Sequence, residues 1–191
     1  RHYDVGRLKS LFEIMKKENY SDEFLLKMNQ DYKTSLKEDP EYFHKKGEFK
    51  GQVSEKKVND EMDKYHFSLN AAPLIHEYNK RLRERGLIDF NDAINMVIDA
   101  LRSNEDLKLR YQEQYQHILT DEYQDTNGSQ NEILFQLSDY DDQPNLFVVG
   151  DDDQAIFKFQ GANMYNISTF VNKFNPQIIV LTNNYRSHQT I

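Results

Sequence analysis

The chain has 191 residues, a length that corresponds to one or two domains. With 38% hydrophobic residues, 12 Tyr and 12 Phe, it is too apolar for a disordered segment. No apolar run reaches the roughly 20 residues of a transmembrane helix, and the first residues do not resemble a signal peptide. Cysteine is absent, which excludes disulfide scaffolds, thiol catalysis and cysteine zinc sites and fits a reducing compartment.

Charge is distributed unevenly along the chain, whose formal net charge is −8. Residues 1–90 carry 18 basic and 17 acidic side chains, whereas residues 91–191 carry 6 and 15. The total argues weakly against nucleic-acid binding, because phosphate contacts need Lys and Arg. The concentration of acid in the second part is expected if carboxylates serve a site there, and the alternative is an uneven surface composition.

The first part of the chain is predicted to be helical. Leu8, Leu11, Phe12 and Met15 recur at helical spacing. A second helix, capped by Ser21 or Asp22 and ended by Pro40, is predicted from the spacing of five apolar residues: Phe24, Leu25, Met28, Tyr32 and Leu36.

A polar connection and a third helix follow. Residues 44–57 hold two glycines and five lysines and are predicted to form a loop. From Ser68 to Arg85 one long helix is expected, with Leu74, Tyr78 and Leu82 on one stripe, and Gly86 suits its C-terminal cap.

After Gly86 the pattern changes to that of an α/β fold. Asp89 caps a helix with Asp92 at its third position, and its expected buried face is Ala93, Ile94, Val97, Ile98 and Leu101. Strands at 117–120, 146–149 and 178–181 then alternate with helices near 129–137 and 163–173, which predicts a parallel sheet with helical crossovers. We therefore divide the chain into a helical subdomain, 1–87, and an α/β part, 88–191.

Each expected strand is followed by polar residues, in the segments 121–125, 150–154 and 183–187. The carboxyl ends of parallel strands form the ligand-binding edge of a sheet. Crowded carboxylates need a cation, and magnesium with a phosphate ligand meets that need. Taken singly, each acidic run is better explained by a structural role, and the Asp151–Asp153 run in particular by a solvated turn.

Four segments in this order are far more specific: GLIDFNDAI, ILTDEYQDTNGSQ, VVGDDDQAIFKFQGA and LTNNYRS. The combination resembles the UvrD/Rep/PcrA-like superfamily 1 DNA helicases, clearly over residues 78–191. The resemblance implies a partial P-loop NTPase, or RecA-like, motor domain. Residues 1–87 would correspond to the helical 1B insertion, and residues 88–191 to the C-terminal part of domain 1A, with motif IV and the start of domain 2A at the end.

The resemblance implies ATP and Mg²⁺ as cofactors and assigns roles to five residues. Asp121 would bind Mg²⁺ and Glu122 would be the catalytic base. Gln154 would sense the γ-phosphate and couple it to DNA, and Arg186 would reach that phosphate across the cleft. Tyr185 would stack on the adenine.

Three aromatic residues would contact single-stranded DNA by the same resemblance: Phe90, Phe157 and Phe159. Stacking suits a motor that ignores sequence, since every base offers a π-face. Without the family context, Phe157 and Phe159 are better explained as core residues, and Phe90 could instead staple its helix. Gln124 and Asp125 could brace the site. The basic residues of 80–85 are interpreted mainly as a solvated helix face, and the lysines of 44–57 as the better candidates for phosphate contacts.

Two features depart from the family pattern. Gln160 stands where Arg is common, while Ala155 and Phe157 replace Ser and Tyr. No G-x-x-x-x-G-K-[ST] phosphate loop occurs in the 191 residues, so we expect them to be an internal piece without significant ATPase activity by itself.

The predicted whole protein is an ATP-dependent 3′–5′ DNA helicase or translocase. Its expected partners are single-stranded DNA and single-strand/duplex junctions, with no membrane, in the cytoplasm and near the nucleoid. The open alternatives are the motor part of a helicase–nuclease and a non-catalytic DNA-binding module.

Overall fold

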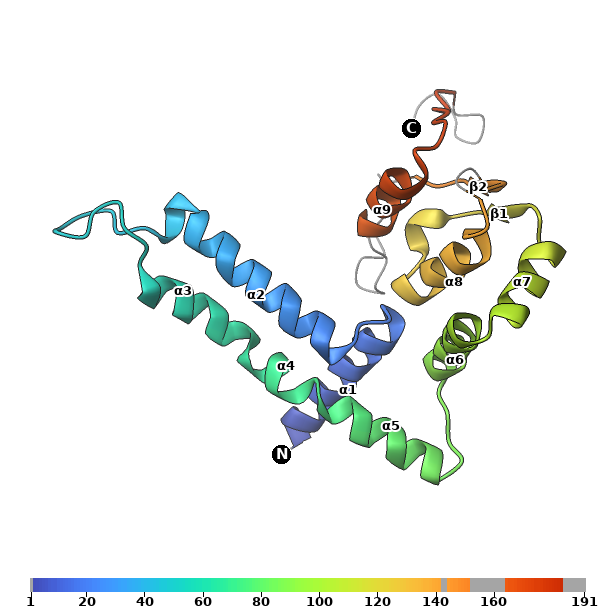
Figure 1. The fold of residues 1–191 in the computed structure, drawn as a ribbon. Helices are drawn as coiled ribbons and strands as arrows, with labels where there is room; N and C mark the ends of the chain where they lie inside the picture. The colour runs from blue at the N-terminus through green and yellow to red at the C-terminus, as the bar shows by residue number, and fades with distance from the viewer. Residues whose placement is uncertain (1, 142–143, 152–163, 184–191) are drawn as a thin grey trace, which may run out of the picture.

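The computed structural model describes residues 2–141, 144–151 and 164–183 (Figure 1). This part of the chain is mostly helical, with a small two-stranded parallel sheet. The helices are α1 (His2–Lys17), α2 (Asp22–Glu38), α3 (Glu55–Met62), α4 (His66–Ala71), α5 (Leu74–Glu84), α6 (Phe90–Ser103), α7 (Glu105–Gln114), α8 (Gly128–Ser138) and α9 (Met164–Phe174). The strands are β1 (Ile118–Thr120) and β2 (Leu146–Val148). None of the described helices is long and apolar enough to cross a membrane.

Helices α2 to α5 form an elongated arm, in which α2 lies alongside α3 and α4 (Figure 1). At its tip the chain turns through residues 44–52, and Phe43 pairs with Val53 in an isolated antiparallel bridge. At its base, α1 contributes Phe12 and Met15 to a small buried cluster with Ala72 and Ile75. The predicted helices over the first two segments are confirmed, including the Ser21 cap, whose Oγ accepts the Phe24 N–H at 3.1 Å.

The single helix expected over 68–85 is wrong. Helix α4 ends at Ala71 and α5 begins at Leu74, on either side of Pro73. Proline has no N–H to donate and its ring clashes with the preceding turn, so it ends a helix. The expected stripe is also wrong, because Leu74 and Tyr78 are exposed and Ile75 is buried instead.

The end of α5 matches the prediction at Gly86. The glycine adopts a φ of +63°, its N–H donates to the Arg83 carbonyl at 3.0 Å, and the Leu87 N–H donates to the Leu82 carbonyl at 2.9 Å. This is the pair of hydrogen bonds that closes a helix with a left-handed residue.

Strands β1 and β2 are parallel, with Leu119 opposite Phe147, and α8 lies between them in sequence. The predicted β–α–β crossover is therefore confirmed. The third predicted strand, 178–181, is not confirmed. These residues have no strand partner among the described elements, and all four side chains are exposed. A β-branched apolar run becomes a strand only where another backbone pairs with it.

Helix α6 confirms its predicted cap and only part of its predicted buried face. Ile98 and Leu101 are buried, whereas Val97 is exposed. Helix α7 was not predicted, although Asn104 caps it by accepting the Leu107 N–H at 2.9 Å. Because α6 packs on α7, α8 and α1, its buried face is set by three neighbours rather than by one stripe.

Candidate functional site

The polar ends of the two strands lie at the same edge of the sheet. Thr120 ends β1 opposite Val148, the last residue of β2, and the Val149 N–H donates to the Thr120 carbonyl at 2.8 Å. Asp121 and Glu122 follow β1, and Asp151 follows β2. The structure thus brings Asp121 and Glu122 to the same edge of the sheet as Asp151.

Glu122 adopts a left-handed conformation, with φ +49° and ψ +45°. For a residue with a side chain this conformation is uncommon and is found preferentially at functional turns. The Glu122 N–H donates to Asp121 Oδ1 at 2.9 Å, so the two acidic residues share one tight turn. Both side chains are exposed.

Gln124 holds this turn against the second strand end. Its amide Nε2 donates to Glu122 Oε2 at 2.7 Å, and its Oε1 accepts the Asp151 N–H at 3.0 Å. Gln124 is only 3% exposed. These contacts show that Gln124 braces the turn, and whether it also touches a ligand stays a prediction. A Cβ added to Gly150 would lie 2.8 Å from Gln124 Oε1, so the glycine leaves room for this bridge.

Tyr123 holds the turn in place from its buried side. Its N–H donates to the Val149 carbonyl at 2.9 Å, its hydroxyl donates to Asn131 Oδ1 in α8, and its ring packs edge-on against Phe170 in α9. The side chain is 2% exposed, and burial raises the pKa of the phenol well above its ordinary value. The buried Tyr123 and the exposed Glu122 therefore lie on opposite sides of the turn.

Asp121 presents a carboxylate that could hold a magnesium ion. One oxygen accepts the Glu122 N–H, and no described residue hydrogen bonds to the other. Within the described ranges no group of three acidic, His or Cys side chains could enclose a metal. Mg²⁺ commonly uses one or two carboxylates together with waters and phosphate oxygens, so one exposed carboxylate fits it.

Phe90 is the third predicted site residue that the structure describes. It is the first residue of α6 and is 80% exposed. A ring exposed to this degree does not staple its helix, so that alternative is wrong. Its exposure leaves the aromatic face available to a ligand.

The other five predicted site residues, Gln154, Phe157, Phe159, Tyr185 and Arg186, lie outside the described residues. The sequence did not point to Tyr123 and Asn131, because their hydrogen bond joins the turn to a helix residue eight positions later. In α5, Arg81 pairs with Glu77 at 2.7 Å and both are exposed. Exposure is common to a solvated face and to a phosphate-binding face, so both interpretations of residues 80–85 stay predictions.

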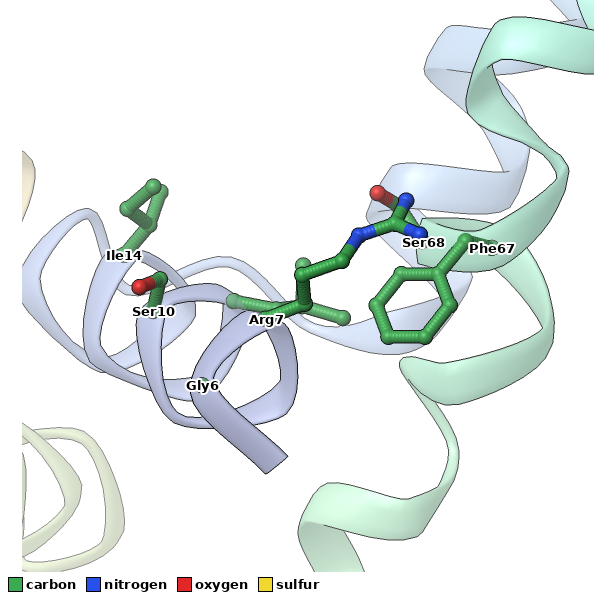
Figure 2. Close-up of a pocket in the computed structure, with 7 residues that line it drawn as sticks. Gly6, Arg7, Ser10, Ile14, Phe67 and Ser68 are labelled. Carbon is green, nitrogen blue, oxygen red and sulfur yellow. The ribbon is translucent and has the colours of Figure 1, made fainter. Parts of the chain in front are cut away.

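An open groove of about 510 Å³ lies elsewhere, between α1 and α4 (Figure 2). Arg7 places its guanidinium carbon 3.8 Å from the centre of the Phe67 ring. Gly6, Ser10 and Ser68 line the groove as well, but none of the predicted site residues does. The groove is therefore separate from the turn at Asp121 and Glu122.

Comparison with known proteins identifies relatives over most of the chain. The profile of the UvrD/REP helicase N-terminal domain matches residues 1–175. An ATP-dependent DNA helicase PcrA from Leuconostoc citreum is 40% identical over 126 residues, which cover 65% of this chain and 17% of that protein. An ATP-dependent DNA helicase Rep from Buchnera aphidicola subsp. Acyrthosiphon pisum is 39% identical over 117 residues, or 61% and 18% of the two chains.

A UvrD1 helicase from Mycobacterium tuberculosis is 36% identical over 126 residues, which cover 63% of this chain and 16% of that protein. The chain thus spans about a sixth of the length of these curated relatives.

Proposed function

The chain belongs to the UvrD/REP helicase N-terminal domain family, and on that basis we propose that it forms part of an ATP-dependent DNA helicase that moves 3′ to 5′ on single-stranded DNA. The observation that carries the proposal is the turn after β1. There, Asp121 and Glu122 stand exposed at the carboxyl edge of a parallel sheet, beside the end of β2. Parallel sheets bind ligands at this edge.

In this proposal Asp121 binds Mg²⁺ and Glu122 takes the proton from the attacking water. When bound, Mg²⁺ supplies positive charge that stabilises the phosphate oxygens of ATP. The Gln124 amide holds one Glu122 oxygen at 2.7 Å, which leaves the other for the water. Since Gln124 Oε1 also accepts the Asp151 N–H, Gln124 links Glu122 to the segment that follows β2.

The residues outside the described ranges complete the proposal by family resemblance. Gln154 and Arg186 contact the γ-phosphate, Tyr185 stacks on the adenine, and Phe157 and Phe159 stack on bases of the DNA. Phe90 adds a further aromatic contact, supported by its exposure at the start of α6. The proposed ligands are therefore ATP, Mg²⁺, single-stranded DNA and its junctions with duplex, and the proposed location is the bacterial cytoplasm.

The test is ATP turnover by the full-length protein with Glu122→Gln, in the presence and absence of single-stranded DNA. General bases contribute about 10²- to 10⁴-fold, so we expect DNA-stimulated turnover to fall by that factor. Glu113→Gln is the matched control, since Glu113 is exposed on α7 and forms no ion pair within the described part of the chain.

DNA-stimulated turnover that survives Glu122→Gln would remove Glu122 from the proposed role. A full-length protein that carries a phosphate loop but hydrolyses no ATP would favour the alternative of a non-catalytic DNA-binding module.

A further inference from the structure

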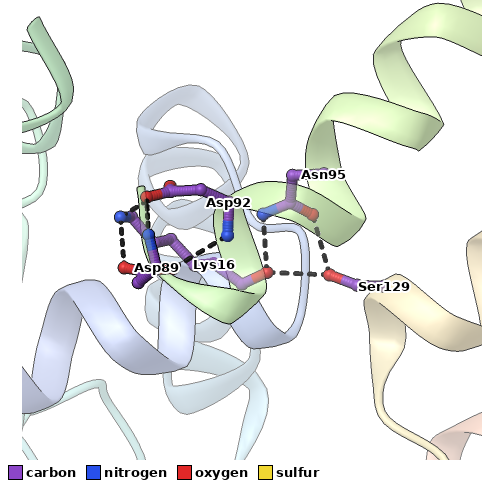
Figure 3. Close-up of polar contacts among 5 residues, drawn as sticks. All are labelled: Lys16, Asp89, Asp92, Asn95 and Ser129. Atoms are coloured by element: carbon purple, nitrogen blue, oxygen red, sulfur yellow. Dashed lines mark hydrogen bonds and ion pairs between the residues drawn. The ribbon is translucent and has the colours of Figure 1, made fainter. Parts of the chain in front are cut away.

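Lys16 is a buried cation that has no role in the proposed mechanism. It lies near the end of α1 and is 4% exposed. Its Nζ lies 2.7 Å from Asp89 Oδ2 and 2.6 Å from Asp92 Oδ1 (Figure 3). A buried ammonium is tolerated only where charged partners replace water, and here two carboxylates from α6 do so.

The two carboxylates also build the N-terminal cap of α6. Asp89 Oδ1 accepts the Asp92 N–H at 2.8 Å, and Asp92 Oδ2 accepts the Asp89 N–H at 3.0 Å. Lys16 therefore binds the two oxygens that the cap leaves over. Burial lowers the pKa of Lys16, but the hydrogen bonds and charges of Asp89 and Asp92 outweigh burial and raise it above its ordinary value.

The backbone of Lys16 extends the same contact to α8. Its carbonyl accepts the Asn95 amide Nδ2 at 2.9 Å and the Ser129 hydroxyl at 2.7 Å, and that hydroxyl lies 2.9 Å from Asn95 Oδ1 (Figure 3). Ser129 is in the first turn of α8, a few residues after the turn that carries Asp121. One residue of α1 thus fixes the starts of both α6 and α8.

Phe90 stands between the two carboxylates in sequence and projects from the turn that they cap. At 80% exposure its ring has little packing of its own, so the backbone of this turn sets its position. We propose that Lys16 is a positioning residue for the Phe90 contact with single-stranded DNA, acting through Asp89 and Asp92. This inference rests on the proposed function of Phe90.

The experiment uses the absence of tryptophan from the chain. Phe90→Trp places a single indole at the exposed position, in the 191-residue chain with Lys16 intact and with Lys16→Met. Indole anisotropy without DNA reports how firmly position 90 is held, and quenching by a short dT oligonucleotide reports stacking. With Lys16→Met we expect lower anisotropy and at least about a fivefold weaker titration, a partial loss of the stacking of one base.

Lys17→Met is the matched control, since it removes the adjacent charge and Lys17 has no ion pair within the described ranges. It should leave both readouts unchanged. Asp92→Asn, which keeps the Lys16–Asp89 pair, should give an intermediate loss, and it takes over the test if far-UV circular dichroism shows that Lys16→Met does not fold.

Equal anisotropy and equal quenching with and without Lys16 would overturn the inference while leaving the DNA contact in place. If the oligonucleotide quenches neither protein, the proposed DNA contact at Phe90 fails and the inference fails with it.

Discussion

At the scale of single residues, the exposed and the buried residues of one turn have different roles. Glu122 adopts an unfavourable left-handed backbone conformation, which costs on the order of 1 kcal/mol of folding free energy. The turn is held by buried neighbours, because Tyr123 binds β2 and α8 and Gln124 binds Glu122 itself. The exposed acids can therefore face a ligand while their positions are fixed from inside.

Tyr123→Phe tests this support. The substitution leaves the ring in place but removes the hydrogen bond that Asn131 Oδ1 accepts from the Tyr123 hydroxyl, and Asn131 is 5% exposed. A buried polar atom without a partner costs about 1–3 kcal/mol, so we expect the free energy of unfolding to fall by that amount in urea denaturation. Tyr115→Phe, at a tyrosine that is 46% exposed, should change it by less than about 0.5 kcal/mol. Equal effects of the two substitutions would show that the Tyr123 hydroxyl does not stabilise the fold.

At the scale of elements, the end of α1 and the start of α8 meet backbone to backbone. Gly128 begins α8, and its N–H donates to Glu18 Oε2 at 2.9 Å. A Cβ at this position would lie 2.5 Å from the Glu18 carbonyl oxygen. The close approach explains why a glycine begins this helix. The cap at Asn127 by itself does not require a glycine at the next position.

Gly128→Ala should therefore destabilise the protein. Helix propensity alone would favour Ala by roughly 1 kcal/mol, but the clash is with backbone, which cannot rotate away, and overpacking costs about 1–3 kcal/mol. Gly6→Ala is the matched control, because Gly6 lies within α1 with nothing within 4 Å of its added Cβ. It should be neutral or stabilising in thermal unfolding. An increase in stability from Gly128→Ala would mean that α1 and α8 do not meet this closely.

At the scale of the whole molecule, α1 joins the arm to the α/β part. Its apolar side packs with Ala72 and Ile75 of the arm, and its last turn contacts α6 and α8. The Lys16 ion pairs connect the end of α1 to the start of α6. The arm is thus tied to both the proposed DNA contact and the helix that follows the proposed ATP site.

The contribution of these ion pairs should depend on pH in a defined direction. Burial raises the pKa of Asp89, but hydrogen bonds and the charge of Lys16 outweigh burial and lower it below 3.8. The stabilisation is therefore complete above the unfolded value of 3.8 and is lost as pH falls through the lower folded value. The raised pKa of Lys16 keeps its own contribution complete up to about its unfolded value of 10.5.

Lys16→Met should lower the free energy of unfolding by about 1.5–3 kcal/mol between pH 5 and 9, the range expected for hydrogen bonds to charged groups. In urea denaturation at pH 7, 5 and 3, the difference from the unsubstituted protein should shrink at the lowest pH. A difference that stays constant across this range would contradict the role of Asp89.

The sequence by itself determined what a few neighbouring residues can encode. The cap at Asp89, the helix end at Gly86 and the strands around 118 and 146 were predictable because each depends on contacts within one or two turns. The meeting of Asp121 with the end of β2 was predictable too, because parallel strands joined by a helix place their carboxyl ends together.

Only the tertiary structure decided which surfaces are buried and which backbones meet. The run at 178–181 has the composition of a strand but lacks a pairing partner among the described residues, and Val97 has the spacing of a core residue but faces solvent. Lys16 is indistinguishable from Lys17 in sequence, yet one is buried between two helices. The physical reason is that burial and pairing depend on residues distant in the chain, which local patterns do not specify.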